Sequence, residues 1–326
     1  MDMQYTILGR TGLKVSVAGL GCGGGSRLGL SKGKSEAEAV ALVRHALDLG
    51  VNVLDTAATY GTEVVVGKAI KSVARDKVVV STKLTPRRDG KPIAAADAMA
   101  SLDNSLRQLD TDHLDILHLH GVFPKEYDVL YQTVVPALLK ERDKGKFRFL
   151  GITETAPNDP TQSMIQRALQ DDVWDAVMMA FHMLNQTPRK RTLPRLIEKN
   201  IGTLMMFVVR NIFSVPGRLH DEIRGQVEAG KLPAVIADDK EPLNFLIHKA
   251  GAESLIDAAY RYVRHEPGCN VILLGTSDIK HMDTNVASIL RPPLPEADRA
   301  RLAKVFGHLE GVGLDMSGAG SHGKTA

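Results

Sequence analysis

Residues 35–55, SEAEAVALVRHALDLGVNVLD, contain the pattern that decides the fold. Ser35 and Glu38 have the spacing of a capping box, in which two side chains satisfy free backbone N–H groups at the start of a helix. Gly50 marks the end of that helix, because glycine readily takes the left-handed conformation of a C-terminal cap. Residues 51–55 form a short valine-rich run, which is typical of a buried strand. The segment is therefore predicted to be a helix that leads directly into a strand.

The same alternation of strand and helix repeats along most of the chain. Strands are expected at residues 15–20, 51–55, 77–83, 113–120, 147–152, 176–180, 202–207 and 271–274. Helices are expected at residues 35–50, 64–73, 93–109, 131–144, 160–170, 192–199, 255–265 and 279–289. Eight βα units close naturally into a barrel, whereas a doubly wound sheet normally has fewer strands and a glycine-rich dinucleotide turn. We therefore expect an α/β protein, a (β/α)8 TIM barrel, with residues 1–316 as one domain.

Three further segments lie outside the eight units. Residues 5–15 are predicted to form an N-terminal β-hairpin that turns through residues 9–12, GRTG. A long insertion follows the seventh strand, and residues 296–309 form an extra C-terminal helix. The small, polar residues 317–326 are expected to be a disordered tail.

Composition limits the class of partner. The chain has 326 residues, 41 Lys plus Arg and 38 Asp plus Glu, so the formal net charge is only +3. This charge favours a small-molecule partner over nucleic acid or a membrane, and leaves the oligomeric state open. The first residues lack the pattern of a secretory signal, and no apolar run is long enough to span a membrane, so a cytoplasmic location is expected. There Cys22 and Cys269, which match no metal or disulfide spacing, are expected to be free thiols.

Polar side chains end three successive strands. Asp55 ends the second strand, Lys83 the third and His120 the fourth, while Tyr60 follows in the loop after Asp55. In a barrel of this kind the active site lies at the carboxyl ends of the strands. Each residue alone could cap a turn or pack under a loop. Together they predict a site, because a buried Asp or Lys costs several kcal/mol unless it is paired.

The segments around these residues resemble the aldo-keto reductase family. Residues 55–63, DTAATYGTE, with Gly67 and Ala69 behind them, are similar to the family's Asp-Thr-Ala-x-x-Tyr-Gly signature. Residues 102–120 resemble its second signature, and residues 8–16 resemble its N-terminal hairpin. The resemblance covers nearly the whole chain. It implies an NAD(P)H-dependent oxidoreductase that reduces an aldehyde or ketone, or oxidises an alcohol.

The match also implies a catalytic tetrad of Asp55, Tyr60, Lys83 and His120. A carbonyl that accepts a hydride develops negative charge on oxygen and needs a proton, and Tyr60 is the candidate acid. A free phenol has a pKa near ~10, and a neighbouring Lys83 ammonium favours its phenolate. Asp55 would hold that ammonium, and His120 would orient the carbonyl. We therefore expect Lys83 to lower the pKa of Tyr60.

The resemblance carries over a set of cofactor-binding positions, with NADPH as the preferred coenzyme and NADH as the other possibility. The positions are Gly23, Thr153, Glu154, Met178, Met206, Phe207, Gly275, Thr276, Ser277, Lys280, His281 and Asn285. Thr276, Ser277 and His281 would surround the 2′-phosphate, and Asn285 would lie near the adenine. The same residues are also compatible with a simple N-capped helix, since Thr276, Ser277 and Asp278 are good caps.

The positions expected to contact the nicotinamide depart from the family pattern. Thr153 and Glu154 replace Ser-Asn after the fifth strand, and Met178 replaces Gln in the sixth. Thr153 can still form a hydrogen bond, whereas Met178 cannot donate one and Glu154 brings a charge.

Other functions remain open from the sequence. The altered nicotinamide positions are compatible with a cofactor-binding regulatory barrel that has no significant turnover. Lys83 could be the Schiff-base lysine of a barrel aldolase. His118 and His120, two apart on one strand face, could bind a metal as in barrel hydrolases, but no further ligand array is found and no metal is expected.

Overall fold

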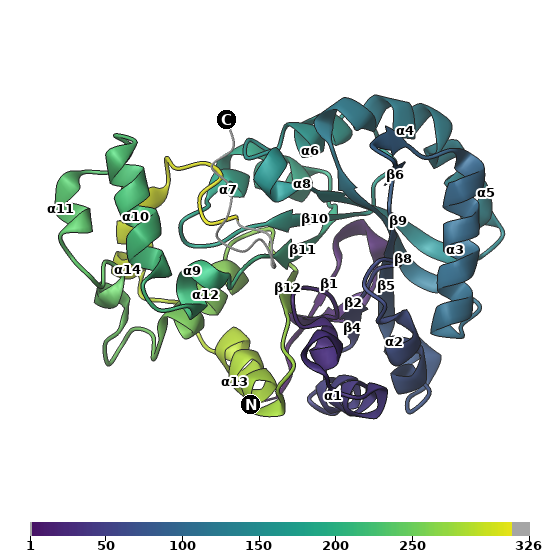
Figure 1. The fold of residues 1–326 in the computed structure, drawn as a ribbon, viewed down its shortest axis with the longest axis horizontal. Coiled ribbons are helices and arrows are strands. Elements are labelled where there is room, and N and C mark those ends of the chain that lie inside the picture. The colour runs from purple at the N-terminus through teal and green to yellow at the C-terminus, as the bar shows by residue number, and fades with distance from the viewer. Residues whose placement is uncertain (1, 315–326) are drawn as a thin grey trace.

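The structure, a computed structural model, describes residues 2–314, and its centre is a closed parallel barrel (Figure 1). The predicted disordered tail at residues 317–326 lies outside the described residues. Hydrogen bonds join the barrel strands in chain order, and the last strand pairs with the first. The strands are β3 (Ala18–Gly21), β4 (Val53–Asp55), β5 (Val79–Leu84), β8 (Leu114–Val122), β9 (Phe147–Glu154), β10 (Ala176–Ala180), β11 (Gly202–Met206) and β12 (Val271–Leu274). The predicted barrel of eight strands is confirmed.

Helices cover the outside of the barrel. They are α1 (Glu36–Asp48), α2 (Glu63–Ile70), α3 (Ala95–Leu109), α4 (Tyr127–Thr133), α5 (Val135–Asp143), α6 (Ser163–Ala168), α7 (Thr187–Arg191), α8 (Leu193–Glu198), α12 (Leu255–Arg264) and α13 (Ile279–Leu290). The capping box that opens α1 is present, since Ser35 and Glu38 each accept a hydrogen bond from the backbone N–H of the other. The predicted helix at residues 131–144 covers the end of α4 and all of α5, and the predicted helix at residues 192–199 is α8, which follows α7 after a break. Pro136 and Pro194 cause these breaks, because proline fits the first turn of a helix but interrupts one that is already running.

The N-terminal hairpin closes one end of the barrel. β1 (Tyr5–Ile7) pairs antiparallel with β2 (Lys14–Ser16), and the turn between them contains η1 (Gly9–Thr11). Leu8, Leu13 and Val15 pack against barrel residues such as Val53 and Ile116. The hairpin therefore forms an apolar floor. The predicted first strand, residues 15–20, begins too early, because its first residues pair with β1 and not with the barrel.

The insertion after β11 forms a lobe on one side of the barrel (Figure 1). It contains α9 (Asn211–Ser214), α10 (Arg218–Glu228), α11 (Ala234–Ala237) and η6 (Asn244–Leu246), and the predicted extra C-terminal helix is α14 (Glu296–Phe306). A small hairpin of β6 (Arg87–Arg88) and β7 (Lys91–Pro92) follows β5. In the described part of the chain, no helix is long and apolar enough to cross a membrane.

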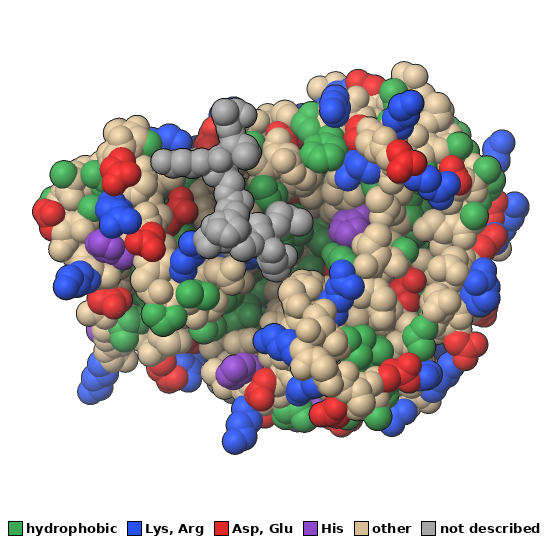
Figure 2. Space-filling view, in the orientation of Figure 1, with side chains coloured by type: hydrophobic (Ala, Val, Ile, Leu, Met, Phe, Trp, Pro, Cys, Tyr) green, Lys and Arg blue, Asp and Glu red, His purple; other side chains and the backbone are tan. Residues whose placement is uncertain are grey.

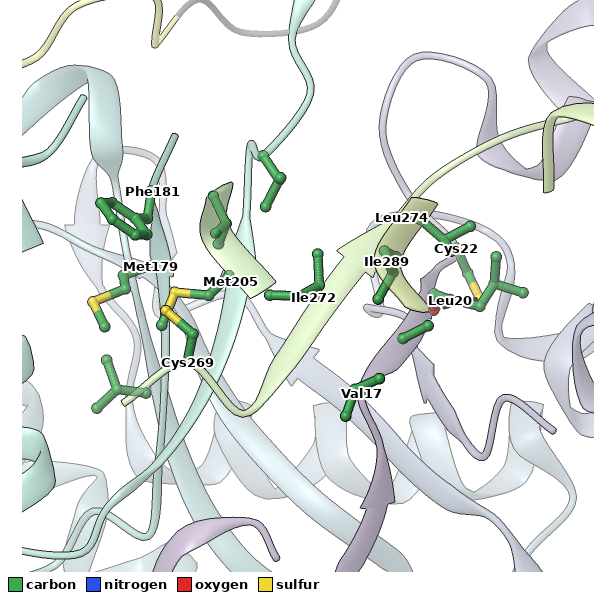
Figure 3. Packing of buried hydrophobic residues seen from close by; sticks show 14 of the residues in the cluster. Val17, Leu20, Cys22, Met179, Phe181, Met205, Cys269, Ile272, Leu274 and Ile289 are labelled. Carbon is green, nitrogen blue, oxygen red and sulfur yellow. Dashed lines mark hydrogen bonds between the residues drawn. The ribbon is translucent and has the colours of Figure 1, made fainter. Parts of the chain in front are cut away.

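The two cysteines lie at opposite ends of neighbouring strands. Figure 3 places Cys22 beside Leu20 and Leu274, and Cys269 at the start of β12. Leu274 is aligned with Leu20, so about five strand residues of about 3.3 Å each separate the thiols by roughly 16 Å or more. A disulfide requires Cα atoms within about 7 Å. Both thiols are buried and free, and burial raises the pKa of each.

We therefore predict that Cys22 and Cys269 stay unpaired under mild oxidation. Titration with a thiol reagent should detect neither thiol quickly in the folded protein and both after unfolding, because the folded barrel shields them. The same titration after exposure to oxidised glutathione should still count two thiols. A loss of both thiols without a change in mass from glutathione would indicate an intramolecular disulfide, and would contradict the strand register.

Candidate active site

A buried ion pair forms the base of the site. Lys83 Nζ lies 2.6 Å from Asp55 Oδ2 and also donates to the carbonyl oxygen of Thr56 at 2.7 Å. Ser81 donates to the second carboxylate oxygen of Asp55 at 2.8 Å. Only 1% of Lys83 and 4% of Asp55 is exposed, so each charge depends on the other for its stability. The adjacent strands β4 and β5 place the two side chains next to each other.

Tyr60 and His120 complete the cluster above this pair. The Tyr60 hydroxyl lies 3.2 Å from His120 Nε2, and Lys83 Nζ lies 5.0 Å from the centre of the Tyr60 ring. A turn closed by hydrogen bonds from Ala58 to Lys83 and from Tyr60 to Ala57 holds the tyrosine over the barrel. The four residues predicted from three strand ends are therefore in one place.

Two glycines make this arrangement possible. A Cβ atom at Gly23 would lie only 2.4 Å from the Tyr60 ring, so any larger residue would displace the tyrosine. Gly121 has a φ of +62°, and the pairing of β8 with β9 shifts register between Leu119 and Val122. An irregularity of this kind redirects the side chains beside it. His120 lies in this irregular segment, at the edge of the site.

Burial dominates the electrostatics of the site. It raises the pKa of Tyr60 above its usual value of 10.0, and the nearby Lys83 ammonium offsets only part of this effect. The expected lowering of the Tyr60 pKa by Lys83 is therefore present, but it is smaller than the effect of burial. Burial would lower the pKa of Lys83, but the Asp55 carboxylate raises it above its usual value. Burial, with Lys83 and Arg87, lowers the pKa of His120 to about 3, so its imidazole is neutral.

A groove of about 670 Å³ leads away from this cluster. Asp55 and Tyr60 line one part of it, and residues of α12 and α13 line another. The face drawn in Figure 2 is hollowed near its centre, with hydrophobic side chains inside the hollow. The predicted cofactor residues that line the groove are Gly23, Met178, Met206, Phe207, Gly275, Thr276, His281 and Asn285.

Phe207 is held in an unusual backbone conformation. Its φ is +62°, a left-handed value that bulky residues seldom adopt, and such values collect at functional sites. The guanidinium of Arg210 lies 4.0 Å from the centre of its ring. Arg210, which also lines the groove, was not predicted, because nothing in the sequence separates it from the many arginines that are simply solvated.

The loop between β12 and α13 both caps the helix and contributes residues to the groove. Asp278 caps α13, since its side chain accepts a hydrogen bond from the backbone of His281 at 3.0 Å. Thr276 accepts one from the backbone of Asp278 at 3.0 Å, while Thr276 and His281 also line the groove. Ser277 and Lys280 are not among the residues that line it.

Lys34 is a second residue that the sequence did not reveal. Its Nζ donates to the backbone carbonyl of Ser277 at 2.5 Å, across 243 residues of chain. The ammonium also helps to lower the pKa of Asp278, after the larger effect of the hydrogen bond from the His281 backbone. A positive charge from the other end of the chain therefore lies at the start of α13.

Thr153 and Glu154 lie outside the set that lines the groove. Thr153 accepts a hydrogen bond from the backbone of Gly121 at 2.6 Å, which fixes the irregular segment next to His120. Glu154 accepts one from the backbone of Ala180 at 2.5 Å and one from Gln162 Nε2 at 3.1 Å. Its carboxyl is buried, and burial raises its pKa to about 8. These contacts join Glu154 to β10 and to the residue before α6.

This buried carboxyl predicts a pH-dependent stability. The pKa of Glu154 is above its ordinary value of 4.5, so the folded state binds this proton more tightly than the unfolded state. Its contribution to stability is complete below about pH 4.5 and is lost as the pH rises through 8. Because Gln stays neutral, Glu154→Gln should remove about 3–5 kcal/mol of this pH dependence. Urea unfolding at pH 5 and pH 8 measures the free energy of unfolding of the wild type and of the variant. The same pH dependence in both proteins would contradict a raised pKa of Glu154 in the folded state.

The geometry gives no support to a metal centre. No group of three or more His, Cys, Asp or Glu residues within residues 2–314 is arranged to hold a metal ion. His118 and His120 are two residues apart on β8, and no third ligand joins them in the described part of the chain.

Comparison with known proteins agrees with the fold and the motifs. A sequence model of the Aldo/keto reductase family matches residues 20–306. L-galactose dehydrogenase from Arabidopsis thaliana is 30% identical over 317 residues, which is 95% of each chain. The structure is similar to a holo form of an aldo-keto reductase from Bacillus halodurans, with a TM-score of 0.71, 24% identity, and coverage of 98% of this chain and 99% of that one. A thermostable aldo-keto reductase in complex with the inhibitor epalrestat has a TM-score of 0.70, 20% identity, and coverage of 93% and 99%. The chain belongs to the aldo/keto reductase family.

Proposed function

We propose that the protein transfers a hydride between a nicotinamide coenzyme and a small carbonyl compound, reducing an aldehyde or ketone or oxidising the corresponding alcohol. One observation carries this proposal. The buried ion pair of Lys83 and Asp55 lies beside Tyr60, with Lys83 Nζ 5.0 Å from the centre of the tyrosine ring, and a groove of about 670 Å³ leads away from them. Burying an ion pair costs free energy of desolvation. A buried ion pair beside a proton donor is therefore typical of a catalytic site.

Each member of the cluster has a distinct task in this chemistry. When bound, the coenzyme supplies or accepts the hydride. Tyr60 gives its proton to the carbonyl oxygen as negative charge develops there, or takes it back from an alcohol. The Lys83 ammonium stabilises the resulting phenolate, and Asp55 keeps that ammonium in place. His120 is neutral, so it can orient the substrate oxygen by a hydrogen bond without competing as an acid.

The groove has the chemistry that such a coenzyme requires. Met178, Met206 and Phe207 line it with apolar surface, which suits the flat nicotinamide ring. Thr276, His281 and Asn285 line it with hydrogen-bonding groups at the start of α13, where the helix N-terminus also favours an anion. We assign Glu154 no contact with the coenzyme in this proposal. Thr153 acts indirectly, by fixing the backbone next to His120.

We predict a preference for NADPH over NADH. The 2′-phosphate carries about −1.5 to −2 charges, and Lys34, Lys280 and His281 lie around the loop that would receive it. One charge-assisted hydrogen bond of about 1.5–3 kcal/mol corresponds to roughly 10- to 150-fold discrimination. Lys34→Met should weaken NADPH binding about 3- to 10-fold and leave NADH binding unchanged.

Fluorescence quenching gives the dissociation constants of both coenzymes for this comparison. Lys32→Met is the matched control, because Lys32 is an exposed lysine two residues away, whereas the contact with Ser277 is made by Lys34. Equal affinities in the wild type, or tighter binding of NADH, would show that the loop before α13 does not recognise a phosphate.

Aldose sugars are a specific candidate for the substrate. The relative that is 30% identical over 95% of both chains is an L-galactose dehydrogenase, and oxidation of a sugar is the alcohol-oxidising direction of the proposed reaction. We therefore include aldoses with NAD⁺ and NADP⁺ beside aldehydes and ketones with NADH and NADPH. A cytoplasmic location, with no nucleic acid or membrane partner, stays part of the proposal.

One assay separates the proposed reaction from the alternatives. Coenzyme absorbance at 340 nm is followed with each compound of the panel, and binding of both coenzymes is measured in parallel. Steady turnover supports the reductase or dehydrogenase. Binding of coenzyme without turnover would favour the regulatory barrel, and the absence of coenzyme binding would leave the Schiff-base aldolase as the better use of Lys83.

A further inference from the structure

A second histidine, His118, lies inside the barrel beneath the catalytic cluster. It precedes His120 by two residues on β8, and its Cα is aligned with that of Lys83 on β5 and that of Gly151 on β9. Aligned residues of neighbouring strands share a face, so His118 lies on the inward face of the barrel with Lys83. None of the His118 side chain is exposed.

The barrel makes specific room for this ring. A Cβ atom at Gly151 would lie 2.2 Å from His118 Nδ1, so the imidazole occupies the space that a side chain on β9 would otherwise fill. An ordinary residue at position 151 would force the ring out. The neighbouring strand is therefore adapted to a histidine at position 118.

Stability does not account for an imidazole at this place. Neither ring nitrogen of His118 has a hydrogen-bond partner of normal geometry in residues 2–314, and the backbone of Ile152 has only the smallest of the effects on the pKa of the ring. An unpaired buried polar group costs about 1–3 kcal/mol. The layer below is apolar, with Ile116, Leu204 and Val271. An aliphatic residue at position 118 would therefore pack in the barrel without burying an unpaired polar group.

The charged and titratable groups that face His118 are those of the reaction. Lys83, paired with Asp55 of β4, is aligned with it on β5, and His120 follows it on β8. Gly151 brings no side chain from β9. Burial, then Lys83 and His120, hold the pKa of His118 well below its usual value, so the ring is neutral. A neutral imidazole still has a strong dipole, which interacts with the charge of a nearby ammonium without a direct hydrogen bond.

We propose that His118 is a positioning residue that acts through Lys83. Its neutral ring provides a polar neighbour for the ammonium on the side of the barrel interior, and so keeps the charge that Tyr60 needs in order to release and recover its proton. This inference rests on the proposed function, since it concerns the same proton transfer. It explains why a costly polar group is kept inside the barrel, directly beside a buried cation.

The central test replaces His118 by Leu, with His118→Met as a second apolar variant and His118→Asn as a polar one. Both apolar variants should fold with a melting temperature equal to or above that of the wild type, since they remove two unpaired polar atoms. With the most active alcohol or aldose of the panel, kcat should fall about tenfold. The pH dependence of kcat for oxidation should move upward by about half a unit or more, because Tyr60 then has a less stable ammonium beside it. His118→Asn should recover most of both losses.

A packing control separates this effect from a change in the barrel. Ile116→Val alters the same inward face of β8, two residues further from the cluster, and should leave the pH profile unchanged. His118→Leu with the kcat and pH profile of the wild type would overturn the proposal. So would failure of both apolar variants to fold, which would make His118 a structural residue. If the wild type turns over no compound of the panel, the proposed function itself fails and this inference fails with it.

Discussion

Replacing Tyr60 by Phe is expected to remove nearly all turnover and leave coenzyme binding almost intact. The phenol hydroxyl is the group that gives the proton, and general acid catalysis contributes about 10²- to 10⁴-fold. The ring should stay in place, because its carbons pack against Gly23 and the Lys83 ammonium lies 5.0 Å from its centre. Steady-state kinetics measure kcat, and fluorescence quenching measures the dissociation constant of NADPH.

A matched tyrosine provides the control. Tyr131→Phe removes a hydroxyl from α4, on the outside of the barrel and not among the residues that line the groove, and should leave kcat unchanged. A Tyr60→Phe enzyme with near-normal kcat would show that another group supplies the proton, and the assignment of the four residues would have to be abandoned.

Lys83→Met is expected to have the second large effect, on both activity and stability. It removes the partner of a carboxylate that is only 4% exposed, and breaking a buried ion pair costs about 3–5 kcal/mol. It also leaves the phenolate of Tyr60 without its stabilising ammonium, so kcat should fall about as far as in Tyr60→Phe. Urea unfolding gives the change in free energy, and coenzyme oxidation gives the change in rate.

A double variant distinguishes these two effects. Lys83→Met combined with Asp55→Asn removes both charges, so much of the lost stability should return, since no buried charge is left unpaired. The activity should not return. A Lys83→Met protein as stable as the wild type would mean that Asp55 is already protonated, and the ion pair would not be the basis of the site.

The sequence is most informative for features that depend on residues close together in the chain. Strand and helix alternation predicted all eight barrel strands, because each strand is a short, buried, apolar run. The cluster of Asp55, Tyr60, Lys83 and His120 could be predicted because each lies at or just after the end of a strand, and the barrel brings those ends together. Sequence spacing and topology together were therefore sufficient for these four residues.

Other features depend on contacts between distant segments. Lys34 meets Ser277 across 243 residues, and no local pattern marks either residue as a partner. Glu154 follows Thr153 directly, yet successive strand residues point to opposite faces, so one supports the site while the other contacts Ala180 and Gln162. The space that Gly151 leaves for the His118 ring could not be predicted from the sequence either, because the two residues lie on different strands.

The most direct measurement follows the hydride itself. The protein is incubated with the most active aldehyde, ketone or aldose and with coenzyme that carries deuterium at C4 of the nicotinamide ring, or with a deuterated alcohol substrate for the reverse reaction. Mass spectrometry of the product then shows where the deuterium has gone. Our account predicts direct transfer of one deuterium to the carbonyl carbon, or from the alcohol carbon to the coenzyme, and almost none in Tyr60→Phe. Turnover in which the deuterium appears in water would contradict it.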